Sequence, residues 1–169
     1  MARVVPTTIL SHWNQMIPGL MQSAQEFYGS VEAAVMPHDL KNVKFERVSF
    51  SEGGILSAKR EYLQIRRGEH VFHVCAAPFG NGFFISWWLG QVESGIFAWL
   101  ASVPGIGWIV GRFLKPLTYY KIDTAMMFQS VTHGALMQTV DSITQAKGIR
   151  AMTEAERKPV MRDFFDQIG

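Results

Sequence analysis

The sequence predicts a single α+β domain over residues 1–169: an N-terminal amphipathic helix, a four-stranded antiparallel meander, an apolar helical hairpin at 94–117 and a long C-terminal helix. Two periodicities carry this prediction. Apolar residues recur every three or four positions near both ends of the chain, but every second position from 42 to 91. These spacings are those of one helix face and one strand face. Glycine-containing turns separate the alternating stretches, as expected for consecutive hairpins.

The composition indicates that this domain has more apolar surface than an ordinary soluble protein of its size. Hydrophobic residues make up 48% of the chain and charged residues 18%, against about 25% charged in typical soluble domains. We therefore expect a partner subunit, a ligand or a membrane to cover part of the surface. The formal net charge of +2 is too small to imply nucleic acid, so no nucleic-acid partner is expected.

Cysteine content and the N-terminus bear on the cellular compartment. The single cysteine, Cys75, excludes an internal disulfide and fits a reducing environment. The first residues do not have the pattern of a secretory signal. We expect the protein in the cytoplasm or at the inner face of the membrane.

The first apolar stripe predicts the N-terminal helix. Its residues lie three or four positions apart: Leu10, Trp13, Ile17, Leu20, Ala24, Phe27, Val31 and Val35. Pro18 interrupts the stripe without changing its phase, so we expect a kink or two abutting helices there. Pro37 ends the segment.

Four strands are expected in the stretches 43–50, 56–67, 69–77 and 83–90. Arg67-Gly68 and Asn81-Gly82 are the expected two-residue turns. This register predicts a core face that holds Leu63, Phe72, Val74, Ile85, Trp87 and Leu89. The opposite face is mixed, and holds Tyr62, Gln64, His73, Cys75, Ser86 and Trp88.

A long helix is predicted from Ile122 to Lys147, because this stretch lacks proline and has a broad apolar face. Gly148 follows it as a helix-ending residue. Thr153 and Glu156 have the spacing of a capping box, and Pro159 prevents a longer helix after them.

The segment 94–117 decides between the candidate functions. No charged residue occurs from Ser94 to Gly111, and Pro104-Gly105 divides this run into two halves. Each half is too short to cross the ~30 Å hydrocarbon core of a bilayer by itself. A kinked span or a re-entrant hairpin in the membrane remains open, as do a hairpin buried in protein and a glycine loop that cradles a ligand.

Aromatic and basic residues around this segment favour a membrane, because such residues are common at bilayer interfaces. The residues expected to contact lipid are Ile96, Phe97, Trp99, Leu100, Ile106, Trp108, Ile109, Arg112, Phe113, Lys115 and Lys121. Gly107 and Gly111 have the small-residue spacing that lets two helices approach closely, so they are the expected self-association residues.

Polar residues give no defensible catalytic or metal site. His70 and His73 point to opposite faces of one strand, whereas His73 and Cys75 share a face, with His133 the one candidate for a third ligand. A half-buried histidine and an inert cysteine explain this pattern more simply. We expect no catalytic residues, no metal and no cofactor.

A basic cluster at Lys59, Arg60, Arg66 and Arg67, with Tyr62 among its members, is compatible with RNA contacts. Protection of an exposed strand against edge pairing explains it equally well.

The sequence thus predicts a non-enzymatic protein that associates with or inserts into membranes and self-associates through the apolar hairpin. The alternative is a soluble homo-oligomeric structural or small-ligand-binding domain whose hairpin is buried at a subunit interface. The pocket of that alternative would lie between the sheet and the long helix. Its expected lining is Trp87 or Trp88 together with the methionines Met126, Met127 and Met137.

Overall fold

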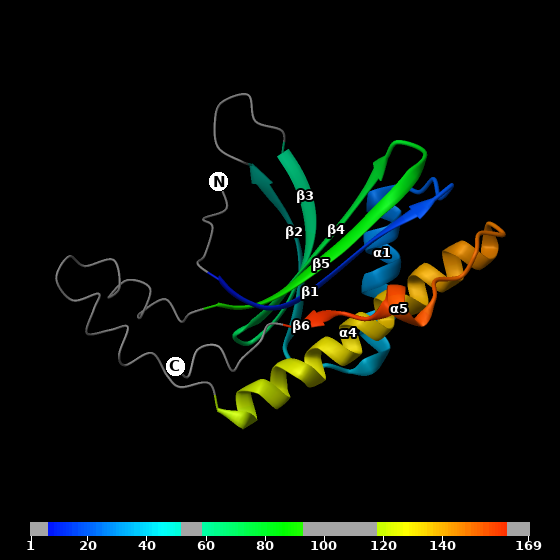
Figure 1. Cartoon of the computed structure of the whole chain (residues 1–169). Coiled ribbons are helices and arrows are strands. Elements are labelled where there is room, and N and C mark those ends of the chain that lie inside the picture. The colour runs from blue at the N-terminus through cyan, green and yellow to red at the C-terminus, as the bar shows by residue number, and fades with distance from the viewer. Residues whose placement is uncertain (1–6, 52–58, 93–117, 162–169) are drawn as a thin grey trace, which may run out of the picture.

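The fold is taken from a computed structural model that describes residues 7–51, 59–92 and 118–161 (Figure 1). In chain order, its elements are β1 (Thr7–Pro18), α1 (Ala24–Val35), the short 3-10 helix η1 (Met36–His38), β2 (Val43–Ser51), β3 (Lys59–Arg67), β4 (His70–Phe79), β5 (Gly82–Val92), α4 (Tyr119–Ala146), α5 (Glu154–Arg157) and β6 (Val160–Met161). The strands form one antiparallel sheet in the order β2-β3-β4-β5-β1-β6. Helices α1 and α4 pack against each other on the same side of this sheet.

The first half of the expected N-terminal helix is a strand, and that prediction was wrong. β1 pairs with β5 along its whole length, but the register shifts between Ile9 and Ser11. This bulge places both Leu10 and Ser11 on the buried side. Trp13 and Ile17 then follow at strand spacing. A bulge followed by a period of two thus produced spacings of three and four, which imitate one face of a helix.

The four expected strands exist as β2 to β5, but the prediction of a four-stranded meander was also wrong. β1 covers the edge of β5, and the short β6 extends the sheet beyond β1. Pairing with β1 satisfies backbone groups that the meander would leave exposed. The described fold is therefore a six-stranded sheet that packs against the short helix α1 and the long helix α4. The helical hairpin expected at 94–117 lies outside the described residues.

Both expected turns are displaced by one residue. Gly68 and Gly80 each take the first position of a two-residue loop, with φ of 59°. Glycine at the first loop position is typical of type II′ hairpins. The pairing consequently shifts by two residues from the expected register, which leaves every side chain on its expected face. All six predicted core residues of the meander are at most 1% exposed.

Helix α1 packs against one part of the core, and one of its side chains hydrogen-bonds to backbone groups of the sheet. Leu63 and Val74 form the last pair between β3 and β4, and the two strands diverge beyond it (Figure 1). The hydroxyl of Tyr28 lies between them. It accepts a hydrogen bond from the Ala76 amide at 2.9 Å and donates one to the Glu61 carbonyl at 2.9 Å. One side chain thus satisfies two backbone groups that lose their strand partner.

The long helix and the capping box are confirmed. α4 begins after Thr118, whose side chain accepts from the Lys121 amide, and the chain reverses at Gly148 with φ of 64°. At α5, Thr153 and Glu156 satisfy each other's backbone amides as a capping box. α5 ends before Pro159, which has no amide hydrogen to continue the helix.

Candidate functional site

Most of the expected membrane-contact residues cannot be placed. The residues from Ile96 to Lys115, together with Gly107 and Gly111, lie outside the described residues. Lys121 is described: it lies in the first turn of α4, with its Nζ atom 3.3 Å from Oε2 of Glu69. This ion pair partly neutralises the positive charge of Lys121, which was expected to contact lipid headgroups. Among the described residues, no helix is both long enough and apolar enough to cross a membrane.

Four described chain ends meet at one end of the fold, which we call the entry end. It contains the start of β1, the end of β5, the start of α4 and β6 (Figure 1). The described residues on either side of segment 93–117, Val92 and Thr118, therefore lie at the same end of the fold. Two aromatic side chains project there immediately after this segment: Tyr119 is 89% exposed and Tyr120 is 79% exposed. Sequence reasoning missed these tyrosines, although their position beside the apolar run was a usable signal.

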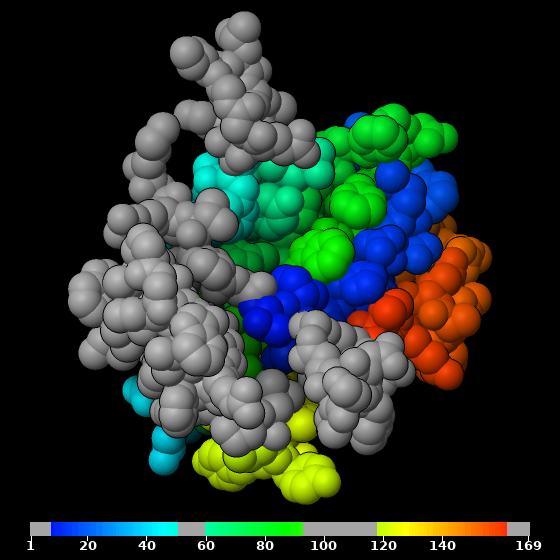
Figure 2. All heavy atoms as spheres, turned by 60° about the vertical axis from the view of Figure 1, so that its left-hand side comes forward, coloured from blue at the N-terminus to red at the C-terminus, as the bar shows by residue number. Residues whose placement is uncertain are grey.

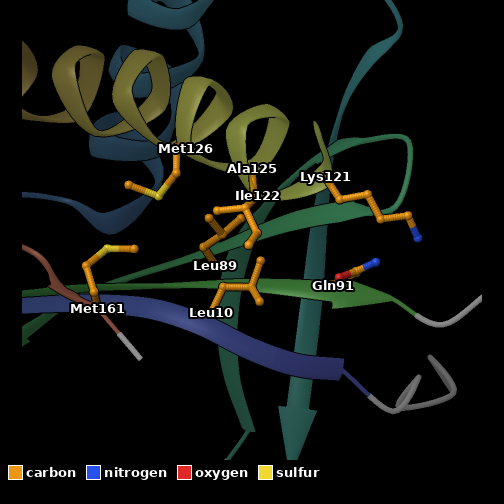
Figure 3. A pocket seen from close by; sticks show the side chains of 8 residues that line it. All are labelled: Leu10, Leu89, Gln91, Lys121, Ile122, Ala125, Met126 and Met161. Atoms are coloured by element: carbon orange, nitrogen blue, oxygen red, sulfur yellow. The ribbon is translucent and has the colours of Figure 1, made fainter. Parts of the chain in front are cut away.

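An apolar pocket lies beside the entry end, between α4 and the sheet (Figure 3). It is lined by Leu10, Leu89, Gln91, Lys121, Ile122, Ala125, Met126 and Met161. The two methionines lie at one side of the pocket, and Gln91 and Lys121 lie at the other. The empty space is about 290 Å³, much of it open to solvent. Its enclosed part has room for only about one water molecule.

The expected lining of this pocket is only partly correct. Met126 lines it, but Met127 projects into solvent and Met137 belongs to the main core. Trp87 is buried farther along α4, where it contacts His133. Trp88 lies on the opposite face of the sheet, because neighbouring strand residues point to opposite sides.

A polar cluster adjoins the pocket at Gln91 and Lys121. Nε2 of Gln91 donates to Oε2 of Glu69 at 3.0 Å, next to the ion pair of Lys121. His70, the strand partner of Gln91, is 6% exposed, and its Nε2 atom has no hydrogen-bond partner in the described part of the chain. Burial lowers the pKa of His70, with the nearby Glu69 carboxylate acting in the opposite direction. The pocket thus combines an apolar floor with a charged and hydrogen-bonding rim.

The structure separates the side chains that had metal-like spacing. His73 and Cys75 lie on the sheet face away from the helices, whereas His133 lies on α4 against the other face. Within residues 7–51, 59–92 and 118–161 there is no cluster of three or more potential metal ligands. Burial lowers the pKa of His73 to about 4 and raises the pKa of the Cys75 thiol. Near neutral pH both groups are uncharged, which makes Cys75 a poor nucleophile.

His133 instead belongs to a buried network that positions the C-terminal elements. Its Nδ1 atom accepts from Nε1 of Trp87 at 3.1 Å, and its Nε2 atom donates to the carbonyl of Arg157 at 2.9 Å. Nε1 of Trp13 donates to the carbonyl of Glu156 at 2.6 Å. These bonds hold the last carbonyl groups of α5 against the core. The sequence signal for this buried hydrogen-bonding role was the position of His133 on the apolar face of a long helix.

Comparisons with known proteins leave the family of this chain open. No family model matches the sequence, and no curated protein is significantly similar to it. Among solved structures, this chain weakly matches the crystal structure of TTHA0849 from Thermus thermophilus, at 12% sequence identity and a TM-score of 0.30. The match covers 84% of this chain and 99% of the other chain. At this level of similarity, it supports no inference about fold or function.

Proposed function

We propose that this protein is a non-enzymatic membrane-associating protein that contacts the bilayer at its entry end. The observation that carries the proposal is the exposure of Tyr119 and Tyr120 directly after the apolar segment. Tyrosine is favoured at membrane interfaces because its ring is apolar and its hydroxyl remains hydrated. An apolar segment and two adjacent interfacial aromatics would therefore enter the same membrane surface.

Neighbouring residues support this orientation. Ile9 and Met161 are each 37% exposed at the same end of the sheet. The sequence places Arg112 and Lys115 on the flank of the apolar segment, where cations favour anionic headgroups. Lys121 would contribute less than these two residues, because Glu69 already pairs with it.

Liposome co-sedimentation of the full-length protein tests the proposal. We expect binding to vesicles that contain anionic lipid, and weaker binding to vesicles of neutral lipid alone. Replacing both Tyr119 and Tyr120 with serine should lower the partition coefficient roughly tenfold, because two apolar ring surfaces no longer leave water.

Phe79→Ser is the matched control. Phe79 is 70% exposed at the tip of the β4–β5 hairpin, at the other end of these strands from the entry end. The Phe79→Ser substitution removes a similarly exposed ring and should leave vesicle binding unchanged. Binding that is insensitive to the tyrosine substitutions, or equally sensitive to Phe79→Ser, would contradict the proposal.

A second candidate function is the binding of a small amphiphilic molecule in the pocket between α4 and the sheet. The observation that favours it is the combination of an apolar floor with Lys121 and Gln91 at one side (Figure 3). An acyl chain would contact Leu89, Ala125 and Met126, while an anionic head would lie near Lys121. Because the enclosed space is small, α4 must move away from the sheet to admit such a ligand.

Calorimetric titration with dodecanoate and with dodecanol separates the contributions of head and tail. We expect tighter binding of the carboxylate, and loss of binding in Ala125→Leu, which fills the floor of the pocket. Ala33→Leu, on the exposed side of α1, is the control. Equal binding by both alanine variants would exclude this pocket as the site.

A further inference from the structure

The sheet face away from the helices carries aromatic rings from five neighbouring strands. They are Phe50 on β2, Tyr62 on β3, His73 on β4, Trp88 on β5 and His12 on β1. Side chains of β1, β5, β3 and β2 are visible together on this face (Figure 2). The alternate residues of the same strands point into the core, as strand geometry requires.

These rings lie in contact and are not scattered. The ring centroids of His12 and Trp88 are 4.8 Å apart with the rings stacked. The ring of Phe50 lies 5.2 Å from that of Tyr62 and 5.3 Å from that of His73. Trp88 is 40% exposed, so a large π surface on the sheet remains in water. In the cross-strand row, its register partners are His12 on β1 and His73 on β4.

Positive charge collects beside the rings. Lys44, Arg60 and Arg66 point to this face, and none of them forms an ion pair with another described residue. Glu46 is the one carboxylate on the same face of the described strands, and its Oε2 atom accepts from Gln64 at 3.2 Å. This face of the sheet is therefore locally basic, although the net charge of the whole chain is only +2.

Lys44 and Arg66 are directly opposite each other across β2 and β3. Like charges in opposite positions of an antiparallel pair destabilise a sheet. A bound anion would offset this repulsion. The pair therefore has the character of an anion-binding position, in a place where a carboxylate partner would otherwise stabilise the fold.

We propose that this face binds single-stranded nucleic acid, whose bases stack on Trp88 and the neighbouring rings while its phosphates lie near Lys44 and Arg66. Stacking platforms with flanking cations are the usual chemistry of sequence-tolerant single-strand binding. Strands about 4.8 Å apart place the row from Glu46 to His12 across roughly 19 Å, enough for a short run of nucleotides. This proposal is independent of membrane association, which uses the entry end.

Fluorescence anisotropy of the full-length protein with labelled oligouridylate and oligothymidylate of about 12 nucleotides tests the proposal. We expect binding that weakens with added salt, and an affinity about tenfold lower in Trp88→Ala, as typical for the loss of one stacking ring. Tyr120→Ala, which removes an exposed ring elsewhere, should bind like the unaltered protein.

Lys44→Glu is the decisive variant, because it should raise the thermal stability and lower the affinity for the oligonucleotide. A glutamate opposite Arg66 forms a cross-strand ion pair, so thermal stability should rise. The affinity should nevertheless fall, and the slope of log K against log salt should decrease by about 0.7 for the lost phosphate contact. Lys41→Glu makes the same change in net charge in the preceding loop.

Several results would overturn the proposal. One is the absence of binding at low salt, and another is equal affinity in Lys44→Glu and Lys41→Glu. A third is a concentration-dependent dimer that Trp88→Ala abolishes, which would assign the rings to an interface between two copies of this chain. Retained thermal stability in Lys44→Glu ensures that lost binding does not merely reflect unfolding.

Discussion

The hydroxyl group of Tyr28 allows two neighbouring strands of the sheet to separate. Between β3 and β4, regular pairing stops after Leu63 and Val74, and the Tyr28 hydroxyl takes over from the backbone. Burial raises the pKa of Tyr28 to about 12. The hydroxyl therefore stays protonated and remains a donor to the Glu61 carbonyl.

Tyr28→Phe should lower the free energy of unfolding by about 1–3 kcal/mol, because it removes the hydrogen-bond partner of the buried Ala76 amide and of the Glu61 carbonyl. Urea denaturation measures this change. Tyr120→Phe removes a hydroxyl from an exposed ring and should have almost no effect. A loss of stability no larger than that of the control would contradict the bridging role of Tyr28.

His73 should make the stability of the fold depend on pH. Its folded-state pKa is about 4 because of burial, whereas an unfolded histidine has a pKa of about 6.5. Below pH 6.5 the unfolded state binds more protons, so stability falls as the pH decreases towards 4. Replacing His73 with glutamine should reduce the slope of unfolding free energy against pH in this window, by at most about 1.4 kcal/mol per pH unit. An unchanged slope would show that other groups carry this pH dependence.

At the scale of elements, β1 shows how a local pattern can mislead. The spacings from Leu10 to Leu20 suit a helix, but a β-bulge, a strand and a turn at Gly19 produce the same spacings. The free energy that decides between them comes from the long pairing with β5, which lies far away in the sequence. The meander was more predictable, because a nearby glycine turn closes both the β3–β4 and the β4–β5 hairpin.

Arg157 connects α5 to α4 through two hydrogen bonds to the Asp141 carboxylate, at 2.9 and 2.7 Å. Arg157→Gln should remove this pair and loosen both α5 and β6. Both side chains are partly exposed, so the global loss of stability should stay below about 1 kcal/mol. Amide hydrogen exchange at Val160 and Met161 should accelerate more than the global value implies.

Lys158→Gln is the control for Arg157→Gln, since it removes a neighbouring exposed cation that has no ion pair among the described residues. Equal exchange rates at β6 in the two variants would contradict an anchoring role for Arg157.

At the scale of the whole molecule, the two faces of the sheet and the entry end offer separate surfaces. The helices cover one face (Figure 1), and the aromatic rings and cations occupy the other. The end of β5 and the start of α4, which flank segment 93–117, lie at the entry end. Membrane association and nucleic-acid binding can therefore be tested with substitutions that do not overlap.

Self-association is predicted to depend on Gly107 and Gly111. Gly107→Leu should prevent close approach of two copies of this segment and weaken assembly about tenfold or more, without unfolding the sheet. Analytical ultracentrifugation in mild detergent measures the assembly, and circular dichroism monitors the fold. Ala101→Leu, in the same segment, is the matched control. An oligomer of unchanged size in Gly107→Leu would exclude a role for this glycine.

The candidate site was less predictable than the fold. Lys121 and Met126 were singled out from sequence, but their proximity to Leu10 and Gln91 depends on how α4 crosses β1 and β5. His133 was considered as a metal ligand, whereas packing directs it to Trp87 and the Arg157 carbonyl. Sequence spacing along one element does not show which side chains meet between elements.

Local sequence signals were sufficient to predict the four strands of the meander, their buried face, the long helix α4 and the capping box at Thr153. These features follow from periodicity, turn residues and caps, which act over a few positions. Contacts between distant segments were needed to establish that β1 is a strand, that Gly68 and Gly80 take the first position of their two-residue turns, and that Lys44 faces Arg66 beside a row of aromatic rings. Those outcomes depend on pairing between distant segments, where the free energy of association overrides the local pattern.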